Sequence, residues 1–322
     1  MIPQISVVIP TYNRAKLLRK CIKALFNQSI NLNLFEIIIV DDGSNDNTSE
    51  VLSKLINYRN NSIKIFKQQN NFSGSARNIG IKNASADIIL SLDDDILADP
   101  NLIEQHLEVH KKYPNLETAV VGKVITSNRG IDIMNPDNRK ISSIGITRHG
   151  DTLVDVNYFT TTNMSLKREF VVEAGLFTPG LSRMDDMDLA FRLKDKGLKL
   201  IYCPEAACIH MRPLDTVEKV VDSGKRYGQT LAEYYRRIPN FQKNIASLGA
   251  RFNGGWAQLI HHPWNYVKDT GRRWAINQYT IRLILGLASK IPVTNPPSRV
   301  LVRLAKEIWA YYFRQEFKMH KG

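Results

Sequence analysis

The sequence predicts an α/β fold in which a mostly parallel sheet is flanked by helices. Short apolar runs without two-residue alternation recur along the first 125 residues, as expected of strands that are covered on both faces. Segments with helical periodicity separate these runs, which favours parallel strands joined by right-handed crossovers. Polar clusters follow several of the runs, and sheets of this kind bind ligands at the edge where their strands end.

Each element of this fold rests on a local pattern. Strands are expected over residues 5–10, 36–40, 63–67, 88–92 and 118–125, and helices over residues 14–27, 75–83 and 102–113, with another from about residue 48. In the helix over 14–27, Leu18, Ile22 and Leu25 fall on one face, as a helix packed on a sheet requires. The polar stretch 127–151 predicts a long loop, and long loops in compact domains often bind ligands.

Composition bounds the class of protein. The 322 residues suffice for one large or two smaller domains. The amino terminus leads directly into a strand rather than a signal peptide, and no apolar run reaches the ~18 residues of a membrane-spanning helix. Three cysteines cannot form a disulfide framework, so Cys21, Cys203 and Cys208 are expected to be buried thiols. These features favour a cytoplasmic protein.

Positive charge is concentrated in the last third of the chain. The net charge is +13, and residues 212–322 hold 19 of the 44 Lys and Arg residues but only 7 of the 31 Asp and Glu residues, together with all four tryptophans. We therefore expect a domain of residues 1–211 followed by a basic, mainly helical region.

This basic region has three interpretations: binding to a membrane, binding to nucleic acid, and packing or oligomer formation. Lys, Arg and Trp favour an anionic membrane surface, so peripheral binding at the cytoplasmic membrane face is one interpretation. Nucleic acid is disfavoured, because residues 1–211 offer no groove or stacking platform for it. The remaining alternative is a helical subdomain that packs on the first domain or forms a homo-oligomer.

Three consecutive carboxylates, Asp93, Asp94 and Asp95, follow the apolar run 88–92. At the edge of a sheet, unpaired charges of one sign repel each other and are costly to desolvate. A divalent cation resolves this conflict, and carboxylate oxygens suit Mg²⁺ or Mn²⁺, which usually bind phosphates as well. The triplet therefore predicts a cation and diphosphate site. The alternative is structural, because the Asp-Pro pair at 99–100 is typical of a helix start, where nearby acids suit the helix dipole.

Polar residues also follow the first two expected strands. Residues 10–14 read Pro-Thr-Tyr-Asn-Arg, and residues 41–44 read Asp-Asp-Gly-Ser. Because parallel strands end at one edge, these clusters and the aspartate triplet are expected to converge on one ligand. A carboxylate there can accept from a base N–H or from ribose hydroxyls, and Gly43 permits a tight turn with positive φ. A turn that caps the following helix would explain residues 41–44 equally well.

Two further clusters lie at expected helix starts. Residues 71–80 combine small residues with Arg77, and a helix start with an arginine suits a phosphate. Residues 183–193 open an amphipathic helix with acids, of which Asp188 is placed to pair with Arg192 one turn later. Acids in a first turn can be purely structural, but two adjacent ones can also supply a substrate-orienting carboxylate and a general base.

A pair of histidines, His106 and His110, stands four residues apart on the helix expected over 102–113. The position of Glu108 between them does not match the metalloprotease pattern. We therefore expect these histidines on a solvated helix face rather than at a metal.

Taken in order, these segments resemble family-2 inverting glycosyltransferases with the GT-A nucleotide-diphospho-sugar transferase fold. The resemblance covers roughly residues 4–212. Its pieces are residues 7–14 (VVIPTYNR), 40–44 (VDDGS), 76–80 (ARNIG) and 92–95 (LDDD), followed by the acidic helix start at Asp185. Each piece is moderately specific, and five pieces in this order are highly specific.

The resemblance implies a role for each candidate site residue. The nucleotide-sugar contacts that it implies are Pro10, Thr11, Tyr12, Arg14, Asp41, Asp42, Ser44, Gly74, Arg77, Asp93 and Asp94. Asp94 and Asp95 occupy the position of the family's DxD-type motif, with Asp95 as the direct ligand of Mn²⁺ or Mg²⁺. His210 resembles a histidine that approaches the metal or the diphosphate; a hydrogen-bonded histidine at a strand end is the alternative. Asp186 matches the catalytic base, and Asp185 orients the acceptor where the family more often has the longer glutamate.

The activity implied by the resemblance is transfer of a sugar from a nucleotide-diphospho-sugar, with a UDP-sugar as the expected donor. The expected acceptor is a hydroxyl of a glycan, lipid-linked or peptide molecule, in polysaccharide or glycolipid biosynthesis. Residues 1–100 would bind the donor and residues 101–211 the acceptor, with residues 126–162 contributing to acceptor choice and residues 161–164 lying near the sugar or acceptor.

Two other functions compete with this one. A sugar-1-phosphate nucleotidyltransferase of the same fold is disfavoured, because such enzymes usually carry a glycine-rich loop where residues 10–14 contain no glycine. A non-catalytic binding module that uses the basic region is disfavoured by the presence of both Asp95 and Asp186.

Overall fold

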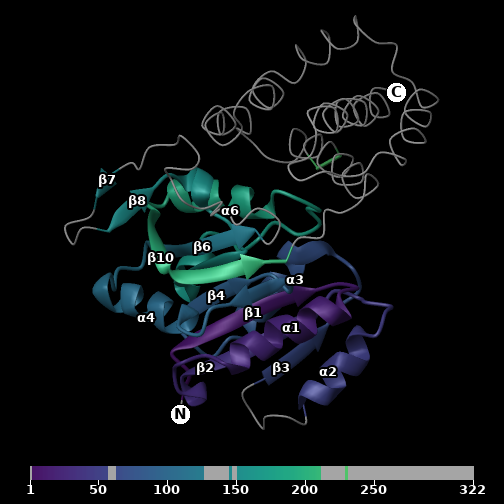
Figure 1. The fold of residues 1–322 in the computed structure, drawn as a ribbon. Coiled ribbons are helices and arrows are strands. Elements are labelled where there is room, and N and C mark those ends of the chain that lie inside the picture. Colours follow the sequence, from purple (N-terminus) through teal and green to yellow (C-terminus); the bar gives the residue numbers. More distant parts are fainter. Residues whose placement is uncertain (1, 57–62, 127–144, 147–150, 212–228, 231–322) are drawn as a thin grey trace, which may run out of the picture. The chain divides into compact units, whose positions relative to one another are not determined.

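A computed structural model describes residues 2–56, 63–126, 145–146, 151–211 and 229–230 of the chain. The chain divides into two units, Met1–Arg212 and Pro213–Gly322. Every helix and strand named below lies in the first unit (Figure 1). The basic helices expected after residue 212, all four tryptophans and most of the loop expected over 127–151 lie outside the described residues.

The described part of the chain builds a mixed, mostly parallel sheet of ten strands in the order β3-β2-β1-β4-β9-β6-β10-β8-β7, with β5 paired to β10. The strands are β1 (Ile5–Thr11), β2 (Phe35–Asp41), β3 (Ile63–Lys67), β4 (Ile88–Leu92), β5 (Ile96–Ala98), β6 (Thr118–Thr126), β7 (Gly145–Ile146), β8 (Thr152–Val154), β9 (Asn163–Lys167) and β10 (Lys199–His210). β1 to β4, β6 and β10 point the same way, whereas β9 runs against its neighbours β4 and β6. The expected α/β fold is confirmed.

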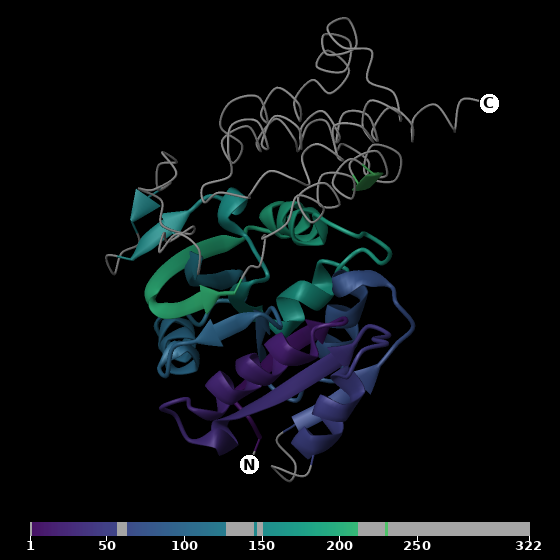
Figure 2. The same cartoon turned by 45° about the vertical axis from the view of Figure 1, so that its right-hand side comes forward.

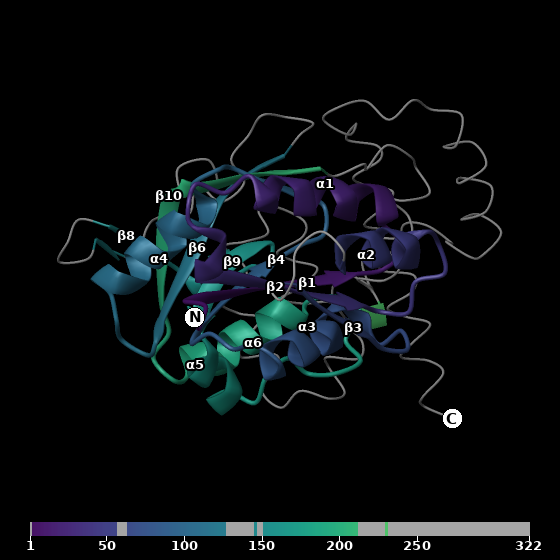
Figure 3. The ribbon, with the colours of Figure 1, turned by 90° about the horizontal axis from the view of Figure 1, so that it is seen from below.

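Helices cover both faces of this sheet. They are α1 (Ala15–Phe26), α2 (Thr48–Ile56), α3 (Phe72–Lys82), α4 (Leu102–Lys112), α5 (Arg168–Glu173) and α6 (Asp185–Lys194), with short 3-10 helices η1 (Leu32–Leu34) and η3 (Val156–Tyr158). Figure 3 shows α1 and α2 on one face and α3, α5 and α6 on the other. Right-handed crossovers explain this division, because the chain moves outward from β1 to β3 and then returns past β1 to β4.

The first half of the sheet forms the core of the unit. β1 and β2 are buried along their whole length, and Val7 of β1 lies in register between Ile37 and Leu90. Such central positions are covered on both faces, which is why the sequence of these strands does not alternate. The apolar face expected for α1 is buried as well.

The second half of the sheet departs from the parallel pattern at β9 and β10. β9 begins at Asn163 opposite Leu92, the last residue of β4, so its beginning lies at the edge where the parallel strands end. β10 pairs with β6 along its length, with a register shift between Cys203 and Ala207 that marks a bulge. Figure 1 and Figure 2 show how strongly β10 bends before it ends at His210.

All five strands expected from the sequence form, each within one residue at either end. The helix expected over 75–83 begins three residues earlier, at Phe72, whose φ of 65° is unusual for a residue other than glycine. The helix expected over 102–113 begins at Leu102 as expected, with Asn101 rather than the Asp-Pro pair at its N-cap. β5, β7, β8 and β9 were not predicted, and of β10 only a strand end at His210 was considered.

Two bulk expectations can be checked in the described residues. Cys21, Cys203 and Cys208 are buried free thiols, as expected, and burial raises the pKa of Cys203 to about 11. Among the described helices, none has the length and apolar content needed to cross a membrane.

Candidate functional site

Several strand ends and one strand beginning meet at one edge of the sheet. Thr11 at the end of β1 pairs in register with Asp41 at the end of β2. Asp93 follows β4 directly, and His210 ends β10. Asn163 begins the reversed strand β9 at the same edge. The polar clusters therefore share one edge, as the parallel fold requires.

Two carboxylates and one imidazole come together at this edge. Asp93, Asp95 and His210 each offer one ligand atom, and these atoms lie within 4.8 Å of one another. We call these three residues the aspartate–histidine cluster. His210 Nε2 lies 3.0 Å from Asp95 Oδ1, yet Oδ1 has no hydrogen-bond partner among the described residues.

The aspartate–histidine cluster fits a divalent cation. Carboxylate oxygens and an imidazole nitrogen suit Mn²⁺, and carboxylates suit Mg²⁺. A buried acceptor without a donor costs free energy, and a cation would remove that cost at Asp95 Oδ1. Burial opposes ionisation of Asp93, but Arg77 and other nearby cations outweigh it and hold the pKa of Asp93 below its ordinary value. Asp93 is therefore available as an anionic ligand.

Asp94 turns away from the cluster toward β1. Thr11 Oγ1 donates to one of its oxygens at 2.7 Å, and Arg14 Nη1 donates to the other at 3.0 Å. Burial raises the pKa of Asp94 to about 6, although Arg14 opposes the shift. Arg14 also donates to Asp95 at 2.7 Å, and its side chain remains 47% exposed. Arg14 thus compensates two carboxylates and still faces solvent.

Arg77 joins the cluster to the start of α6. Its buried guanidinium donates to Asp93 at 2.7 Å, to Ser91 Oγ at 3.1 Å and to Asp185 at 3.2 Å. The sequence predicted a phosphate contact for Arg77, whereas its partners in the structure are protein oxygens. Arg77 thus compensates the buried Asp185 and the partly exposed Asp93, and a buried carboxylate without such a partner is costly.

Gly74 of α3 allows Asp185 to approach closely. A Cβ atom at Gly74 would lie 3.0 Å from Asp185 Oδ2 and 3.2 Å from Phe177 Cβ, which is tighter than ordinary contact. Ser73 Oγ donates to the same carboxylate oxygen at 3.3 Å. Gly74, expected at the donor, is therefore placed where α3 packs against α6.

The other acids in the first turn of α6 have different surroundings. Asp188 is buried and accepts from Thr178 at 2.6 Å and from Arg192 at 2.7 Å, which confirms the predicted pair across one turn. Asp186 accepts from the Met187 N–H at 2.9 Å. It is the most exposed of the three acids in this turn.

The turn after β2 buries Asp41. Its Oδ1 accepts from the Ser44 N–H at 2.8 Å, and the Ser44 hydroxyl accepts from the Asn13 N–H at 2.9 Å. The other oxygen, Oδ2, has no hydrogen-bond partner among the described residues, because Lys67 Nζ stays 3.6 Å away. A buried oxygen in this state can accept from a ligand N–H.

Asp42 is more fully occupied than Asp41. Its Oδ1 accepts from Gln68 Nε2 at 2.6 Å and from the Asn71 N–H at 2.8 Å. Gly43, between the two aspartates, has the positive φ that its sequence predicted, 83°, and a Cβ atom there would lie 3.0 Å from the Asn70 nitrogen. The turn is therefore held by backbone shape as well as by side chains.

The remaining predicted residues at the end of β1 differ in exposure. Pro10 is buried and pairs in register with Val40. Tyr12 is 44% exposed and presents an aromatic side chain beside the site. Of the two, Tyr12 is the residue that a ligand can reach.

The histidines of α4 are buried, so the expectation of a solvated helix face was wrong. His106 and His110 are 0% and 2% exposed and make hydrogen bonds with Asn163 and Ser165 of β9. We call these four residues the histidine network. The helix face that carries them packs on the sheet, and polar partners on β9 make this burial tolerable. Sequence periodicity in α4 cannot reveal those partners.

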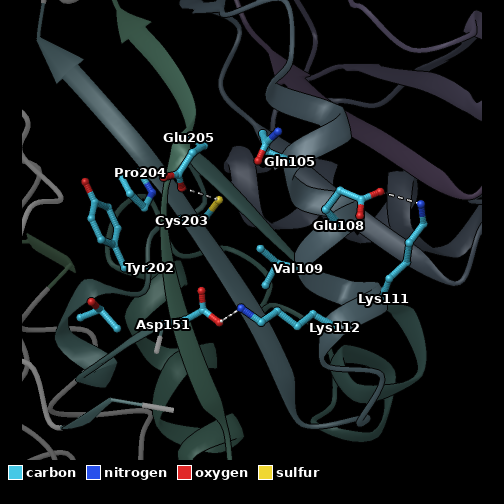
Figure 4. A pocket seen from close by; sticks show the side chains of 11 residues that line it. Gln105, Glu108, Val109, Lys111, Lys112, Asp151, Tyr202, Cys203, Pro204 and Glu205 are labelled. Carbon is cyan, nitrogen blue, oxygen red and sulfur yellow. Dashed lines mark hydrogen bonds and ion pairs between the residues drawn. The ribbon is translucent and has the colours of Figure 1, made fainter. Parts of the chain in front are cut away.

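A hollow of about 690 Å³ lies on another side of α4 (Figure 4). It is lined by α4 between Gln105 and Lys112, by residues 151–152 and by residues 202–205 of β10. Two ion pairs, between Lys111 and Glu108 and between Lys112 and Asp151, occupy charged groups at its wall. None of the individually named candidate site residues lines this hollow, although Asp151 and Thr152 belong to the segment 126–162 expected to contribute to acceptor choice, and we do not assign the site to it.

Sequence reasoning assigned two residues incompletely. Asp93 was expected at the nucleotide-sugar, but it belongs with Asp95 and His210 in the cluster. Asp93 and Asp95 lie at the turn between β4 and β5, which brings both carboxylates toward His210. Thr162 Oγ1 donates to Asp93 at 3.0 Å; the sequence placed it only near the sugar or acceptor.

Known proteins resemble this chain in sequence. A family model described as glycosyl transferase family 2 matches residues 6–175. A validoxylamine A glucosyltransferase of Streptomyces hygroscopicus is 38% identical over 236 residues, which cover 64% of this chain and 54% of the relative. A poly-beta-1,6-N-acetyl-D-glucosamine synthase of Staphylococcus aureus is 31% identical over 180 residues, 55% of this chain and 43% of the relative.

The chain does not span the whole of every relative. An uncharacterized glycosyltransferase of Rickettsia felis is 28% identical over 203 residues, which cover 59% of this chain but only 31% of the relative. The chain therefore matches about a third of the length of that protein.

Solved structures share the fold. The structure of S. aureus TarS 1–349 matches with a TM-score of 0.58 and 15% identity, covering 99% of this chain and 91% of that one. The mannosyltransferase PcManGT from Pyrobaculum calidifontis matches with a TM-score of 0.62 and 14% identity, covering 100% and 89%. These likenesses show the GT-A glycosyltransferase fold.

Proposed function

Because the chain belongs to glycosyl transferase family 2, we propose that it moves a sugar from a nucleoside-diphosphate sugar to an acceptor hydroxyl with inversion at the anomeric carbon. The observation that carries this proposal is the convergence of Asp93, Asp95 and His210 at the edge where the strands end. Family membership favours this activity over that of a sugar-1-phosphate nucleotidyltransferase.

The donor nucleotide is proposed to lie along the ends of β1 and β2. Asp41 Oδ2 is buried without a hydrogen-bond partner among the described residues, and a base N–H would supply its donor. Tyr12 offers an exposed aromatic ring beside it. We propose UDP as the nucleotide; TarS has been solved with UDP and with UDP-GlcNAc, whereas PcManGT was solved with GDP-Man. Residues 1–100 are thus proposed as the donor side.

The residues proposed to hold a divalent cation are Asp93, Asp95 and His210. Structures of PcManGT and of GalNAc-T7 contain Mn²⁺, and we propose Mn²⁺ or Mg²⁺ here. When bound, such a cation neutralises charge that develops on a diphosphate leaving group. Arg14 donates to Asp95 and keeps an exposed side, so it can also face the diphosphate.

Asp186 is proposed as the general base. It takes the proton from the acceptor hydroxyl while that oxygen attacks the anomeric carbon opposite the diphosphate, and one displacement inverts the centre. Two observations support this role: Asp186 is the most exposed acid in its turn, and its neighbour Asp185 is tied through Arg77 to Asp93. Asp185 is proposed to orient the acceptor.

The acceptor is proposed to be a glycan or a lipid-linked or peptide molecule on the side formed by residues 101–211. The likeness to a polysaccharide synthase supports polysaccharide or glycolipid biosynthesis.

Calorimetric titration with UDP tests the donor and cation sites together. We expect UDP to bind tightly with Mn²⁺ and weakly in EDTA, and ADP to bind less well than UDP in both. Asp95→Asn should reduce the Mn²⁺-dependent affinity about 10-fold or more, the scale on which metal sites respond to lost ligands and supporting groups. Asp99→Asn, an exposed aspartate nearby, is the matched control. Equal UDP affinity with Mn²⁺ and with EDTA would contradict the cation site.

Peripheral binding to an anionic membrane remains a prediction for residues 212–322. Each Lys or Arg near such a surface contributes about 1 kcal/mol, and salt screens the attraction. We expect the full-length protein to float with vesicles that contain an anionic lipid at low salt and to be released at high salt. Absence of flotation at low salt would favour a packing or oligomer-forming role.

A further inference from the structure

The histidine network connects α4 to β9, and its side chains are 0–2% exposed. His106 Nε2 lies 2.9 Å from Asn163 Oδ1, and His106 Nδ1 lies 2.8 Å from Ser165 Oγ. His110 Nε2 lies 2.9 Å from the same hydroxyl. The proposed reaction uses none of these four residues. Their burial still needs a physical reason, because a polar group removed from water costs free energy unless it is hydrogen-bonded.

The donor and the acceptor of each hydrogen bond in the network can be assigned. Asn163 Nδ2 donates to the carbonyl of Ala206 at 2.8 Å and to that of Lys123 at 3.3 Å, which fixes the orientation of the amide. Asn163 Oδ1 must therefore accept, and His106 Nε2–H donates to it. Burial lowers the pKa of His106 to about 4, so the ring is neutral near pH 7 and its Nδ1 accepts from the Ser165 hydroxyl.

The same reasoning fixes the second histidine. The single Ser165 proton points at His106, so Ser165 Oγ accepts from His110 Nε2–H. His110 Nδ1 then carries a lone pair and no proton, and the structure gives it no hydrogen-bond partner among the described residues. Both histidines are thus assigned the Nε2–H tautomer.

One end of the network holds the bulge of β10. The register of β10 against β6 shifts between Cys203 and Ala207, so the Ala206 carbonyl lies within this irregularity, and Asn163 supplies its donor. Gly122 makes the approach possible, because a Cβ atom there would lie 2.3 Å from both the Ala206 oxygen and Asn163 Nδ2. Beyond the bulge, β10 leads within a few residues to His210.

The backbone at Asn163 lies beside Asp93, the candidate ligand that follows β4. Asn163 pairs in register with Leu92, the residue before Asp93. Thr162, the residue before Asn163, donates its hydroxyl to Asp93 Oδ2 at 3.0 Å. Asn163 is therefore joined by short connections to Asp93 and to His210, two members of the aspartate–histidine cluster that come from different strands.

We propose that Asn163, oriented by His106, is a positioning residue that sets the placement of His210 relative to Asp93 in the candidate cation site. It contacts neither the cation nor the donor; it fixes the bulge from which His210 extends and the strand beginning that supports Asp93. The inference rests on the proposed function, because it concerns the same cation site. Groups that orient metal ligands commonly change affinity 10- to 100-fold when they are removed, by the scale known for outer-shell partners.

Histidine tautomers measured in the wild-type protein test which atoms donate and which accept in the network. Protein labelled with ¹⁵N at histidine should show neutral Nε2–H rings for His106 and His110 at pH 7, with signals assigned by the His106→Gln and His110→Gln variants. An Nδ1–H tautomer at His106 would mean that the Asn163 amide does not donate to Ala206, and it would overturn the proposal.

Cation affinity tests the positioning role. Mn²⁺ binding, followed by the EPR signal of free Mn²⁺ in the presence of UDP, should weaken about 10-fold or more in Asn163→Ala. His110→Ala is the matched control, since it removes an equally buried member of the network that does not contact Asn163. It should lower the melting temperature comparably and leave Mn²⁺ affinity within about twofold. Unchanged Mn²⁺ affinity in folded Asn163→Ala would overturn the proposal.

A milder variant covers the case in which Asn163→Ala does not fold. Ser165→Ala removes the proton donor to His106 and leaves Asn163 in place, and it should weaken Mn²⁺ binding by a smaller factor; no weakening would count against the proposal. Failure of the wild-type protein itself to bind Mn²⁺ with UDP would instead reject the proposed cation site. The two failures are therefore distinguishable.

Discussion

Two buried polar groups share the β9 region of the sheet, and they meet the cost of burial in opposite ways. In the aspartate–histidine cluster, carboxylates lie next to an imidazole, and Asp95 Oδ1 has no hydrogen-bond partner among the described residues. In the histidine network, neutral rings, a hydroxyl and an amide match donors to acceptors in one direction. In the cluster the unmatched atom is a carboxylate oxygen among candidate metal ligands, whereas in the network His110 Nδ1 is left without a partner among the described residues at a position away from those ligands.

The largest effect is expected from removing the positive charge that both halves of the site share. Arg77→Met leaves the buried Asp185 and the partly exposed Asp93 without their arginine, so the free energy of unfolding should fall by about 3 kcal/mol. Urea unfolding followed by circular dichroism measures the loss. Arg192→Met, whose arginine is 31% exposed, is the control and should lose less than half as much. Equal losses in the free energy of unfolding would show that the burial of Arg77 does not make its ion pairs more stabilising than that of Arg192.

A second prediction separates the catalytic role of Asp186 from binding of the donor nucleotide. Asp186→Asn keeps the shape of the side chain and removes its basicity, so turnover should fall by about 10²-fold or more while UDP affinity is kept. Steady-state release of UDP from the donor sugar, together with calorimetry, measures both quantities. If turnover fell in Asp188→Asn and not in Asp186→Asn, the base would be misassigned by two residues.

Acid should destabilise the histidine network. Burial lowers the pKa of His106 from 6.5 to about 4, and burial with Lys167 and His106 nearby lowers that of His110 to about 3. Between these values and 6.5 the unfolded chain binds more protons than the folded chain, so stability falls as pH falls. The expected contribution is about 1.4 kcal/mol per pH unit for each histidine.

Unfolding free energies measured between pH 4.5 and 7.5 check this slope. Carboxylates also titrate in this range, so the informative quantity is the difference between the wild type and the His106→Gln/His110→Gln double variant. The double variant should be less stable at pH 7 and should depend less on pH below 6.5. An identical slope in both proteins would show that the two rings are not held neutral.

The smallest effect is expected at the exposed rim of the site. Lys67 lies 3.6 Å from Asp41 and is 60% exposed, so Lys67→Met should change the free energy of unfolding by less than about 1 kcal/mol. Asp41→Asn, at a 1% exposed side chain in the same pair, should reduce UDP affinity more than Lys67→Met does. The reverse order would place the nucleotide away from Asp41.

Sequence patterns were most informative where one element determines its own environment. β1 to β4 and β6 were located within one residue, because continuous apolar runs in parallel strands are buried whatever lies beside them. β9 escaped prediction because its five residues, Asn163–Lys167, mix polar and apolar side chains that only their neighbours make buried.

The candidate site shows the same limit. The sequence placed Asp93 and Asp95 at the edge that strand ends share, and the resemblance to the family added His210. The sequence could not show that Arg77 joins Asp93 to Asp185 or that His106 is buried, because both facts depend on partners more than 50 residues away in the chain, Asp185 for Arg77 and Asn163 for His106. Long-range pairing of polar groups leaves no periodic trace in either partner.

The reversed direction of β9 has a consequence for how chains of this kind diversify. The segment 127–162 joins the end of β6 to Asn163, which is fixed by its pairing with Leu92. Doubling the length of such a connection costs only about 0.6 kcal/mol of loop-closure free energy. We expect insertions and deletions to be tolerated best between Thr126 and Gly145, ahead of β8 and of the buried side chains of Tyr158 and Phe159, where they leave the pairing of Asn163 with Leu92 intact.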